Sequence, residues 1–252
     1  MNSYWLHGWA TDGLVFKGII DRLPALYKRG AKACDLPGFG AAAPLGKGES
    51  YAGRILSQIS AGERTGEDTA LIGWSQGALV ALEAAYALGT RLRALVLISG
   101  CERFSRSAAN PHGTDRRRLE MMCRSLRSHP REVLEEFYRG MFDHYDPGEW
   151  ERFRLEFWPR YRDQSPEPLT EGLGYLAHVD LSEYTSRITA PVLILHGQRD
   201  RVIDPRLARA LERTLPNATL VVFDSAGHMP FLGREEEFAQ LIGDFFKADT
   251  PD

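Results

Sequence analysis

The chain is built around short apolar runs, each of which ends at a glycine or a turn. Six such runs occur: Tyr4–His7, Ala31–Asp35, Thr69–Ile72, Ala94–Ser99, Val192–His196 and Leu220–Phe223. Most of their residues do not alternate between apolar and polar, which is typical of strands buried on both faces of a parallel sheet. Helical stretches follow several of them, notably Gln76–Leu88, Pro205–Leu215 and Phe231–Phe246. The sequence therefore predicts an α/β protein with a mostly parallel sheet of about six strands.

A long segment between the fourth and fifth runs has helical periodicity and no convincing strand. Within 115–128, apolar residues recur at i, i+3, i+4 and i+7, which places them on one stripe of a helix: Leu119, Met122, Cys123 and Leu126. Later apolar and aromatic residues predict further helices up to His178. We expect a core made of residues 1–101 and 188–252, with 102–187 inserted after the fourth strand as a helical lid.

Composition places the chain among ordinary globular proteins. It has 252 residues, of which 43% are hydrophobic, and a net charge of −3, which gives no support for nucleic-acid binding. Three cysteines, Cys34, Cys101 and Cys123, lack metal-ligand spacing and fit a reducing compartment. No signal peptide and no membrane-spanning run is evident. We expect a cytoplasmic, monomeric enzyme without a metal or an organic cofactor.

The strongest chemical motif is Gly73-Trp74-Ser75-Gln76-Gly77, a G-x-S-x-G pattern. A buried strand enters it and an Ala-rich helix leaves it, which is the context that exposes a nucleophilic serine on a sharp turn. The flanking glycines leave room for backbone that approaches this turn closely. The alternative, a serine that only caps a helix, is less consistent with this context.

A nucleophilic serine needs a base, and the base needs an orienting acid. His228 follows the last strand and is the best base, whereas His196 closes a strand with no evident orienting partner. The acid that fits best is Asp200, although Asp204 is a local rival whose place before Pro205 suits a helix N-cap. The other histidines are His7 beside the first strand and four in the lid, which we expect to be surface or packing residues: His112, His129, His144 and His178.

An oxyanion hole requires two preorganised N–H donors. The backbone N–H of Gln76, which follows the nucleophile, is one candidate, and the N–H of Trp9 in the loop after the first strand is the other. Ser75, Asp200 and His228 then follow the chain order of α/β-hydrolases.

These motifs carry a family resemblance over nearly the whole chain. His7-Gly8-Trp9, the 35–40 motif Asp-Leu-Pro-Gly-Phe-Gly and Gly-Trp-Ser are together similar to the α/β-hydrolase superfamily, and within it to the biotin-pathway carboxylesterases. Those enzymes hydrolyse the methyl ester of pimeloyl-acyl-carrier-protein. The resemblance implies an α/β-hydrolase fold and a triad of Ser75, Asp200 and His228.

The chain also departs from that pattern. It begins at the strand carrying His7-Gly8, without the antiparallel strands that usually precede it, which predicts a smaller sheet unless the start codon is misplaced. Gln76 stands where the family often has an apolar residue, and Ala78 replaces a common glycine. These two changes alter the shape of the expected pocket, for which we expect substrate contacts from Trp9, Phe142 and Met229.

The lid is rich in arginine. Residues 103–163 contain thirteen arginines, no lysine and eleven acidic residues. Arg117, Arg124 and Arg127 would suit the carboxylates and phosphates of an acyl carrier protein. The alternative is a solvated face of i, i+4 pairs, namely Arg116–Glu120, Glu120–Arg124 and Glu135–Arg139.

The resulting expectation is a serine carboxylester hydrolase that acts on a carrier-linked methyl ester. Alternatives on the same scaffold are a general short-chain carboxylesterase, a perhydrolase and a carbon–carbon bond hydrolase. A different class is a catalytically inactive hydrolase fold that binds a partner or a small ligand.

Overall fold

A six-stranded, entirely parallel sheet forms the centre of the computed structural model, which describes residues 1–62, 68–142 and 147–248. The strands are β1 (Asn2–Leu6), β2 (Ala31–Cys34), β3 (Thr69–Trp74), β4 (Leu92–Ile98), β5 (Val192–Gly197) and β6 (Ala218–Phe223). Their order across the sheet is β2-β1-β3-β4-β5-β6. All six predicted strands are present, and the α/β-hydrolase fold expected from the sequence is confirmed.

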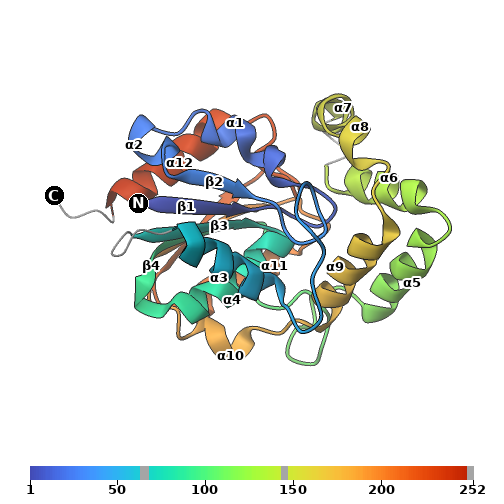
Figure 1. The fold of residues 1–252 in the computed structure, drawn as a ribbon, viewed down its shortest axis with the longest axis horizontal. Coiled ribbons are helices and arrows are strands. Elements are labelled where there is room, and N and C mark those ends of the chain that lie inside the picture. The colour runs from blue at the N-terminus through green and yellow to red at the C-terminus, as the bar shows by residue number, and fades with distance from the viewer. Residues whose placement is uncertain (63–67, 143–146, 249–252) are drawn as a thin grey trace.

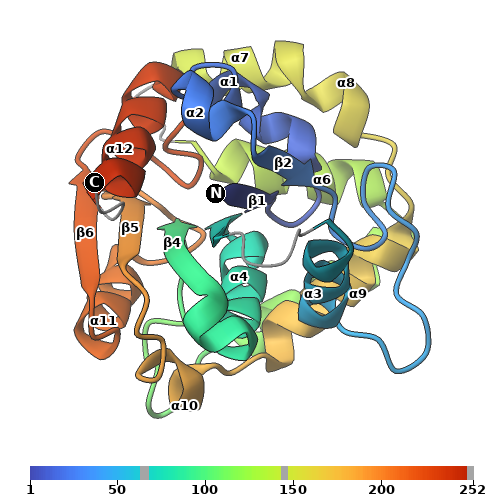
Figure 2. The ribbon, with the colours of Figure 1, turned by 60° about the vertical axis from the view of Figure 1, so that its left-hand side comes forward.

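Helices cover both faces of the sheet (Figures 1 and 2). One face carries η1 (Gly13–Phe16), α1 (Lys17–Ile20), α2 (Ala25–Lys28) and α12 (Glu235–Ala248). The other carries α3 (Tyr51–Gly62), α4 (Gln76–Leu88), η2 (Gly89–Arg91) and α11 (Pro205–Thr214). Every residue of β3 and β5 is buried between these layers, which explains their continuous apolar pattern.

The last helix begins later than the sequence pattern predicts. The expected start at Phe231 is wrong, because α12 begins at Glu235. Phe231 lies in the turn after His228, where its ring packs 5.3 Å from Trp74 and 5.7 Å from Phe16. The apolar residues before Glu235 therefore fill the core without being helical.

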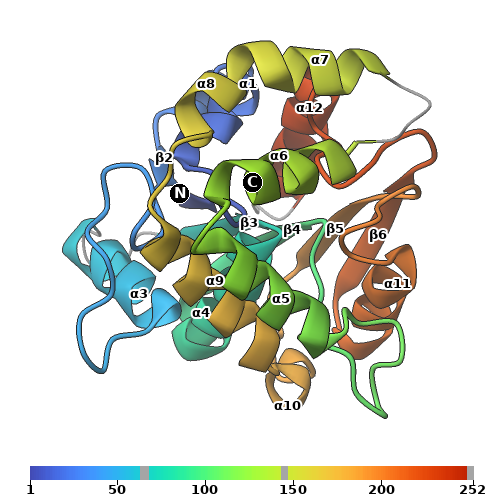
Figure 3. The same cartoon turned by 90° about the vertical axis from the view of Figure 1, so that its right-hand side faces the viewer.

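Six helices follow one another between β4 and β5, and the described residues contain no extended strand there. They are α5 (Arg116–Leu126), α6 (Pro130–Gly140), α7 (Pro147–Glu156), α8 (Trp158–Tyr161), α9 (Pro166–His178) and α10 (Ser182–Thr185). They lie in the segment 102–187 that the sequence predicts as a lid, and that name is kept for it; its helices α5 to α9 gather at one end of the sheet (Figures 1 and 3). The carboxyl ends of four parallel strands, β1, β3, β4 and β5, lie level with one another beneath these helices. Their register shows this: Leu6 pairs with Gly73, Gly73 with Leu97, and Leu97 with Ile194.

Polar contacts fasten the lid to the core. The Tyr161 hydroxyl donates a hydrogen bond of 2.9 Å to Asp12, and Arg160 forms an ion pair with the same carboxylate. The Tyr138 hydroxyl donates to the carbonyl oxygen of Ala10. On the α12 side, Arg234 pairs with Glu149 at 2.7 Å. The lid is therefore held against the loop that follows β1 and against the segment that precedes α12.

Candidate functional site: a hydrogen-bonded serine, histidine and aspartate

Ser75 lies on a sharp turn between β3 and α4. Its φ of 55° is in the left-handed region, which a non-glycine residue adopts only when the surrounding structure holds it there. A Cβ on Gly73 would lie 2.3 Å from the Gly77 carbonyl oxygen, and one on Gly77 would lie 2.0 Å from the Leu6 carbonyl oxygen. Only glycine fits at both positions: Gly73 lets the turn close on the start of α4, and Gly77 lets it pack against the end of β1.

Ser75, His228 and Asp200 form a continuous series of hydrogen bonds. The Oγ of Ser75 lies 2.8 Å from Nε2 of His228, and Nδ1 of His228 lies 2.8 Å from Oδ2 of Asp200. His228 is fully buried, and Ser75 keeps 5% of its surface exposed. Because the carboxylate can only accept, Nδ1 carries the proton, and Nε2 is then free to accept the serine proton.

Asp200 is held as a buried anion. Its Oδ1 accepts hydrogen bonds from the backbone N–H groups of Val202 and Ile203 at 2.8 and 2.9 Å. Burial by itself would raise the pKa of Asp200, but the charge and hydrogen bond of His228, together with His196 and the Ile203 N–H, lower it below the ordinary value. The rival, Asp204, instead accepts from the Arg206 N–H as the N-cap of α11.

The loop that carries His228 is fixed from two sides. The backbone N–H of His228 donates to the Met141 carbonyl oxygen at 2.7 Å, and the Trp74 indole donates to the His228 carbonyl oxygen at 2.8 Å. A Cβ on Gly227 would lie 2.3 Å from the Met141 carbonyl oxygen. The end of α6 in the lid therefore helps to place the histidine, a contact that the sequence does not indicate.

Trp9 and Gln76, the two expected oxyanion donors, both lie beneath the lid. Among the described residues, neither backbone N–H donates to a backbone carbonyl, which leaves both available. The Trp9 side chain is anchored by its Nε1, which donates to the Leu169 carbonyl oxygen at 2.9 Å, and its ring packs 4.7 Å from Phe137. A Cβ on Gly172 of α9 would lie 2.7 Å from the Trp9 ring. The lid thus packs directly on the loop that carries the first donor.

The Gln76 side chain is fully buried, which is unusual for an amide. In the part of the chain that the structure describes, its amide group lies beside the Tyr51 hydroxyl, but neither side chain forms a hydrogen bond of ordinary geometry. Burial raises the pKa of Tyr51 to about 12, although the neighbouring Gln76 amide acts to lower it. The departure from the family pattern at position 76 therefore places a buried amide, with the Tyr51 hydroxyl as its polar neighbour, next to the nucleophile.

The remaining histidines that the structure describes do not contact Ser75. His7 is buried, and its Nε2 accepts the Leu36 N–H at 2.8 Å, so it ties the end of β1 to the loop after β2. His112, His129 and His178 are exposed, while His144 lies outside the described residues. His196 corrects the sequence interpretation, because an acid does lie beside it: its Nε2 is 3.3 Å from Oδ2 of Asp200.

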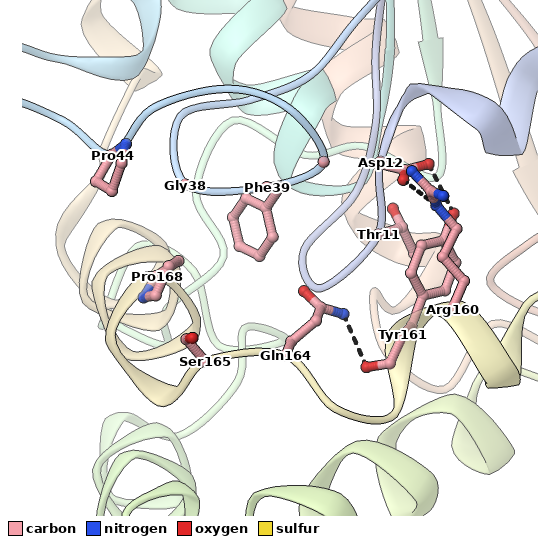
Figure 4. Close-up of a pocket in the computed structure, with 11 residues that line it drawn as sticks. Thr11, Asp12, Gly38, Phe39, Pro44, Arg160, Tyr161, Gln164, Ser165 and Pro168 are labelled. Atoms are coloured by element: carbon pink, nitrogen blue, oxygen red, sulfur yellow. Dashed lines mark hydrogen bonds and ion pairs between the residues drawn. The ribbon is translucent and has the colours of Figure 1, made fainter.

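The expected substrate contacts are buried around the site. Met229 directly follows His228, and Phe142 packs 5.4 Å from Phe153 in the lid. A cavity of about 410 Å³ opens at the seam between lid and core (Figure 4). Its lining is Thr11, Asp12, Gly38, Phe39, Gly40, Pro44, Arg160, Tyr161, Gln164, Ser165 and Pro168. Ser75 does not line it, but Thr11 belongs to the same tight turn as Trp9.

This arrangement suits nucleophilic acyl transfer. A hydroxyl that hydrogen-bonds a histidine, with the histidine oriented by a buried carboxylate, is the constellation that activates serine in hydrolases. Across the described residues, no cluster of three or more His, Cys, Asp or Glu residues could hold a metal ion. The helices in those same ranges are too short or too polar to cross a membrane.

Comparisons with known proteins agree with this chemistry. The family model described as "Alpha/beta hydrolase family" matches residues 4–241. A protein of Neisseria meningitidis named "Pimeloyl-[acyl-carrier protein] methyl ester esterase" is 31% identical, over 96% of this chain and 92% of its own length. A protein of the same name from Aliivibrio salmonicida is 27% identical, over 97% of this chain and 91% of its own.

Solved structures show the same fold. An esterase from Exiguobacterium antarcticum superposes with a TM-score of 0.87 at 23% identity, covering 98% of this chain and 92% of its own. A bromoperoxidase from Bacillus anthracis gives a TM-score of 0.86 at 20% identity with the same coverage. The expected fold, superfamily and esterase-type hydrolase are thus confirmed. The chain belongs to the alpha/beta hydrolase family.

Proposed function

We propose that this protein is a serine carboxylesterase that hydrolyses the methyl ester of a pimeloyl chain carried on acyl carrier protein, as a step of biotin synthesis. The observation that carries the proposal is the hydrogen-bonded series of Ser75, His228 and Asp200 on the lid side of the sheet. Two relatives that are 31% and 27% identical to this chain, and are matched over 92% and 91% of their own length, bear the name of that esterase.

The reaction follows from the geometry of the three residues. Ser75 Oγ attacks the ester carbonyl carbon while His228 Nε2 takes its proton, and Asp200 stabilises the imidazolium that forms. The tetrahedral intermediate collapses, and His228 gives its proton to the departing methoxide, which leaves as methanol. A water molecule then attacks the acyl-enzyme with His228 again as the base, which frees the carboxylic acid and restores Ser75.

The backbone N–H groups of Trp9 and Gln76 have the role of oxyanion donors in this proposal. Gln76 is the first residue of α4, so its N–H has no partner within the helix and points toward developing negative charge. Removing a single donor of this kind typically costs about 10²–10³ in kcat. Trp9 is held in place by its bond to Leu169 and its contact with Phe137.

An arginine-rich face of α5 supports a carrier-protein substrate. Arg117 and Arg124 are exposed on the side opposite the buried Leu119 and Leu126, and 59% of the Met121 side chain between them is exposed. Among the described residues, neither arginine forms an ion pair, and of the three i, i+4 pairs considered from the sequence only Glu135–Arg139 is made. Arg127, just beyond the helix, is exposed as well. Such a face suits an acidic carrier with a phosphate-bearing arm.

Steady-state kinetics with the carrier-linked methyl ester and a free short-chain methyl ester test the proposal. Arg117→Glu and Arg124→Glu should each raise KM for the carrier-linked ester about threefold or more, because exposed charge pairs contribute about 0.2–1 kcal/mol each. Neither should change hydrolysis of the free ester. The matched control is Arg29→Glu, an exposed arginine after α2 at the opposite end of the molecule (Figure 1). Cleavage of the free ester alone would refute the carrier-linked substrate.

A further inference from the structure

His196, at the end of β5, makes contacts that the proposed reaction does not use. It is fully buried, and its Nε2 lies 3.0 Å from the Ile203 carbonyl oxygen and 3.3 Å from Oδ2 of Asp200. Both neighbours are acceptors, so Nε2 must carry the ring's proton. Burial lowers the pKa of His196, which keeps the ring neutral. This N–H therefore donates to the Ile203 carbonyl, and it lies beside the carboxylate that orients His228.

This contact completes the surroundings of the Asp200 carboxylate. Its Oδ1 accepts from the Val202 and Ile203 N–H groups, its Oδ2 accepts from His228, and Nε2 of His196 lies 3.3 Å from Oδ2. His196 also holds the Ile203 carbonyl, so it links the carboxylate to the very turn that anchors Oδ1. Rotation of the carboxylate would break contacts on both oxygens at once.

We propose that His196 is a positioning residue that fixes the Asp200 carboxylate toward His228 and shares its negative charge. The proposal rests on the proposed function of Ser75, His228 and Asp200. The His196 N–H lies beside Oδ2, so its positive end offsets part of the charge that acts on the His228 proton. Loss of this N–H also frees the Ile203 carbonyl, which loosens the turn that anchors Oδ1, and it leaves more of the Oδ2 charge to act on His228.

Two other ionisable groups lie near His196 and Asp200. Asp204, at the N-cap of α11, adds negative charge near His196. The Cys101 thiol, just after β4, faces Asp200, and burial raises its pKa so that it stays neutral. A change in the pH profile on substitution of His196 therefore reports on Asp200 and His228.

The test measures kcat, KM and the pH dependence of kcat/KM with p-nitrophenyl acetate, which needs no carrier protein. In His196→Phe, which has a ring but no donor, we expect kcat to fall about tenfold and KM to stay within about twofold. The acidic midpoint of kcat/KM should move up by about half a pH unit, since the lost N–H lies beside Oδ2 and donates to the Ile203 carbonyl instead. His196→Gln can still donate and should keep the wild-type midpoint. His129→Phe, an exposed histidine, is the matched control.

The outcomes separate the two proposals. Wild-type activity together with an unchanged or lowered acidic midpoint in His196→Phe would overturn the role of His196 and leave the proposed function intact. A wild-type protein that hydrolyses no ester would overturn both. Should His196→Phe not fold, ¹⁵N-histidine NMR spectra of the wild type decide the question. We expect a neutral His196 protonated at Nε2 at neutral pH, and an Nδ1–H or doubly protonated ring would refute the proposal.

Discussion

Replacing Asp200 with asparagine tests how the three polar residues act together. Because Oδ1 accepts two backbone N–H groups, the asparagine oxygen must occupy that place, and its NH₂ group then faces Nδ1 of His228. An NH₂ group only donates, so Nδ1 must lose its proton and Nε2 must carry it. His228 then presents N–H to Ser75 and has no site for the serine proton. A forced tautomer of this kind is known to lower kcat about 10⁴-fold, which corresponds to about 5.5 kcal/mol of transition-state stabilisation.

The assay is steady-state hydrolysis of p-nitrophenyl acetate near neutral pH, with thermal unfolding recorded on the same sample. The expected result is a loss of about 10³–10⁴ in kcat with the fold intact. Asp204→Asn is the control, because Asp204 caps α11 and should affect stability without abolishing turnover. An Asp200→Asn protein within tenfold of wild-type kcat would refute the assignment of Asp200 as the orienting acid.

Two further predictions concern stability. Gln76→Leu removes two buried amide atoms that form no hydrogen bond of ordinary geometry among the described residues. It should stabilise the fold by about 1 kcal/mol, seen as a Tm about 2–4 °C higher, and a lower Tm would show that the amide is stabilised by its neighbour Tyr51. Burial lowers the pKa of His7 and of His196 below the ordinary histidine value of 6.5. Below that pH the unfolded chain therefore binds more protons than the folded one, and the free energy of unfolding falls as the pH falls. The urea midpoint should therefore be lower at about pH 5.5 than at about pH 7.5, and an unchanged midpoint would argue against two neutral buried histidines.

Structure can be predicted from the sequence where the local residue pattern directly reflects how deeply the segment is buried. The strands are recognisable because both faces of the sheet are covered, and the turn at Ser75 is recognisable because two close backbone approaches require Gly73 and Gly77. Helix α3 is less visible, since Gly53 and several polar residues interrupt its buried positions. Residues at strand ends that come from distant parts of the chain, such as Asp200 and His228, can be proposed from order alone.

Contacts made across the lid and within irregular turns escape that reasoning. Nothing in the sequence indicates that the Met141 carbonyl holds the His228 N–H, because the two residues are far apart in the chain and only the packing of α6 brings them together. The contact between His196 and Asp200 depends on how the turn after β5 folds back on itself, which the apolar pattern of the strand does not predict.

The most direct test of the central claim, that Ser75 is an activated nucleophile, is to label the purified protein with a fluorophosphonate probe and locate the adduct by peptide mass spectrometry. We expect one adduct per chain on Ser75, no adduct in Ser75→Ala, and much slower labelling in Asp200→Asn. An unlabelled Ser75 in folded wild-type protein would contradict this claim and would favour a hydrolase fold that binds without catalysis.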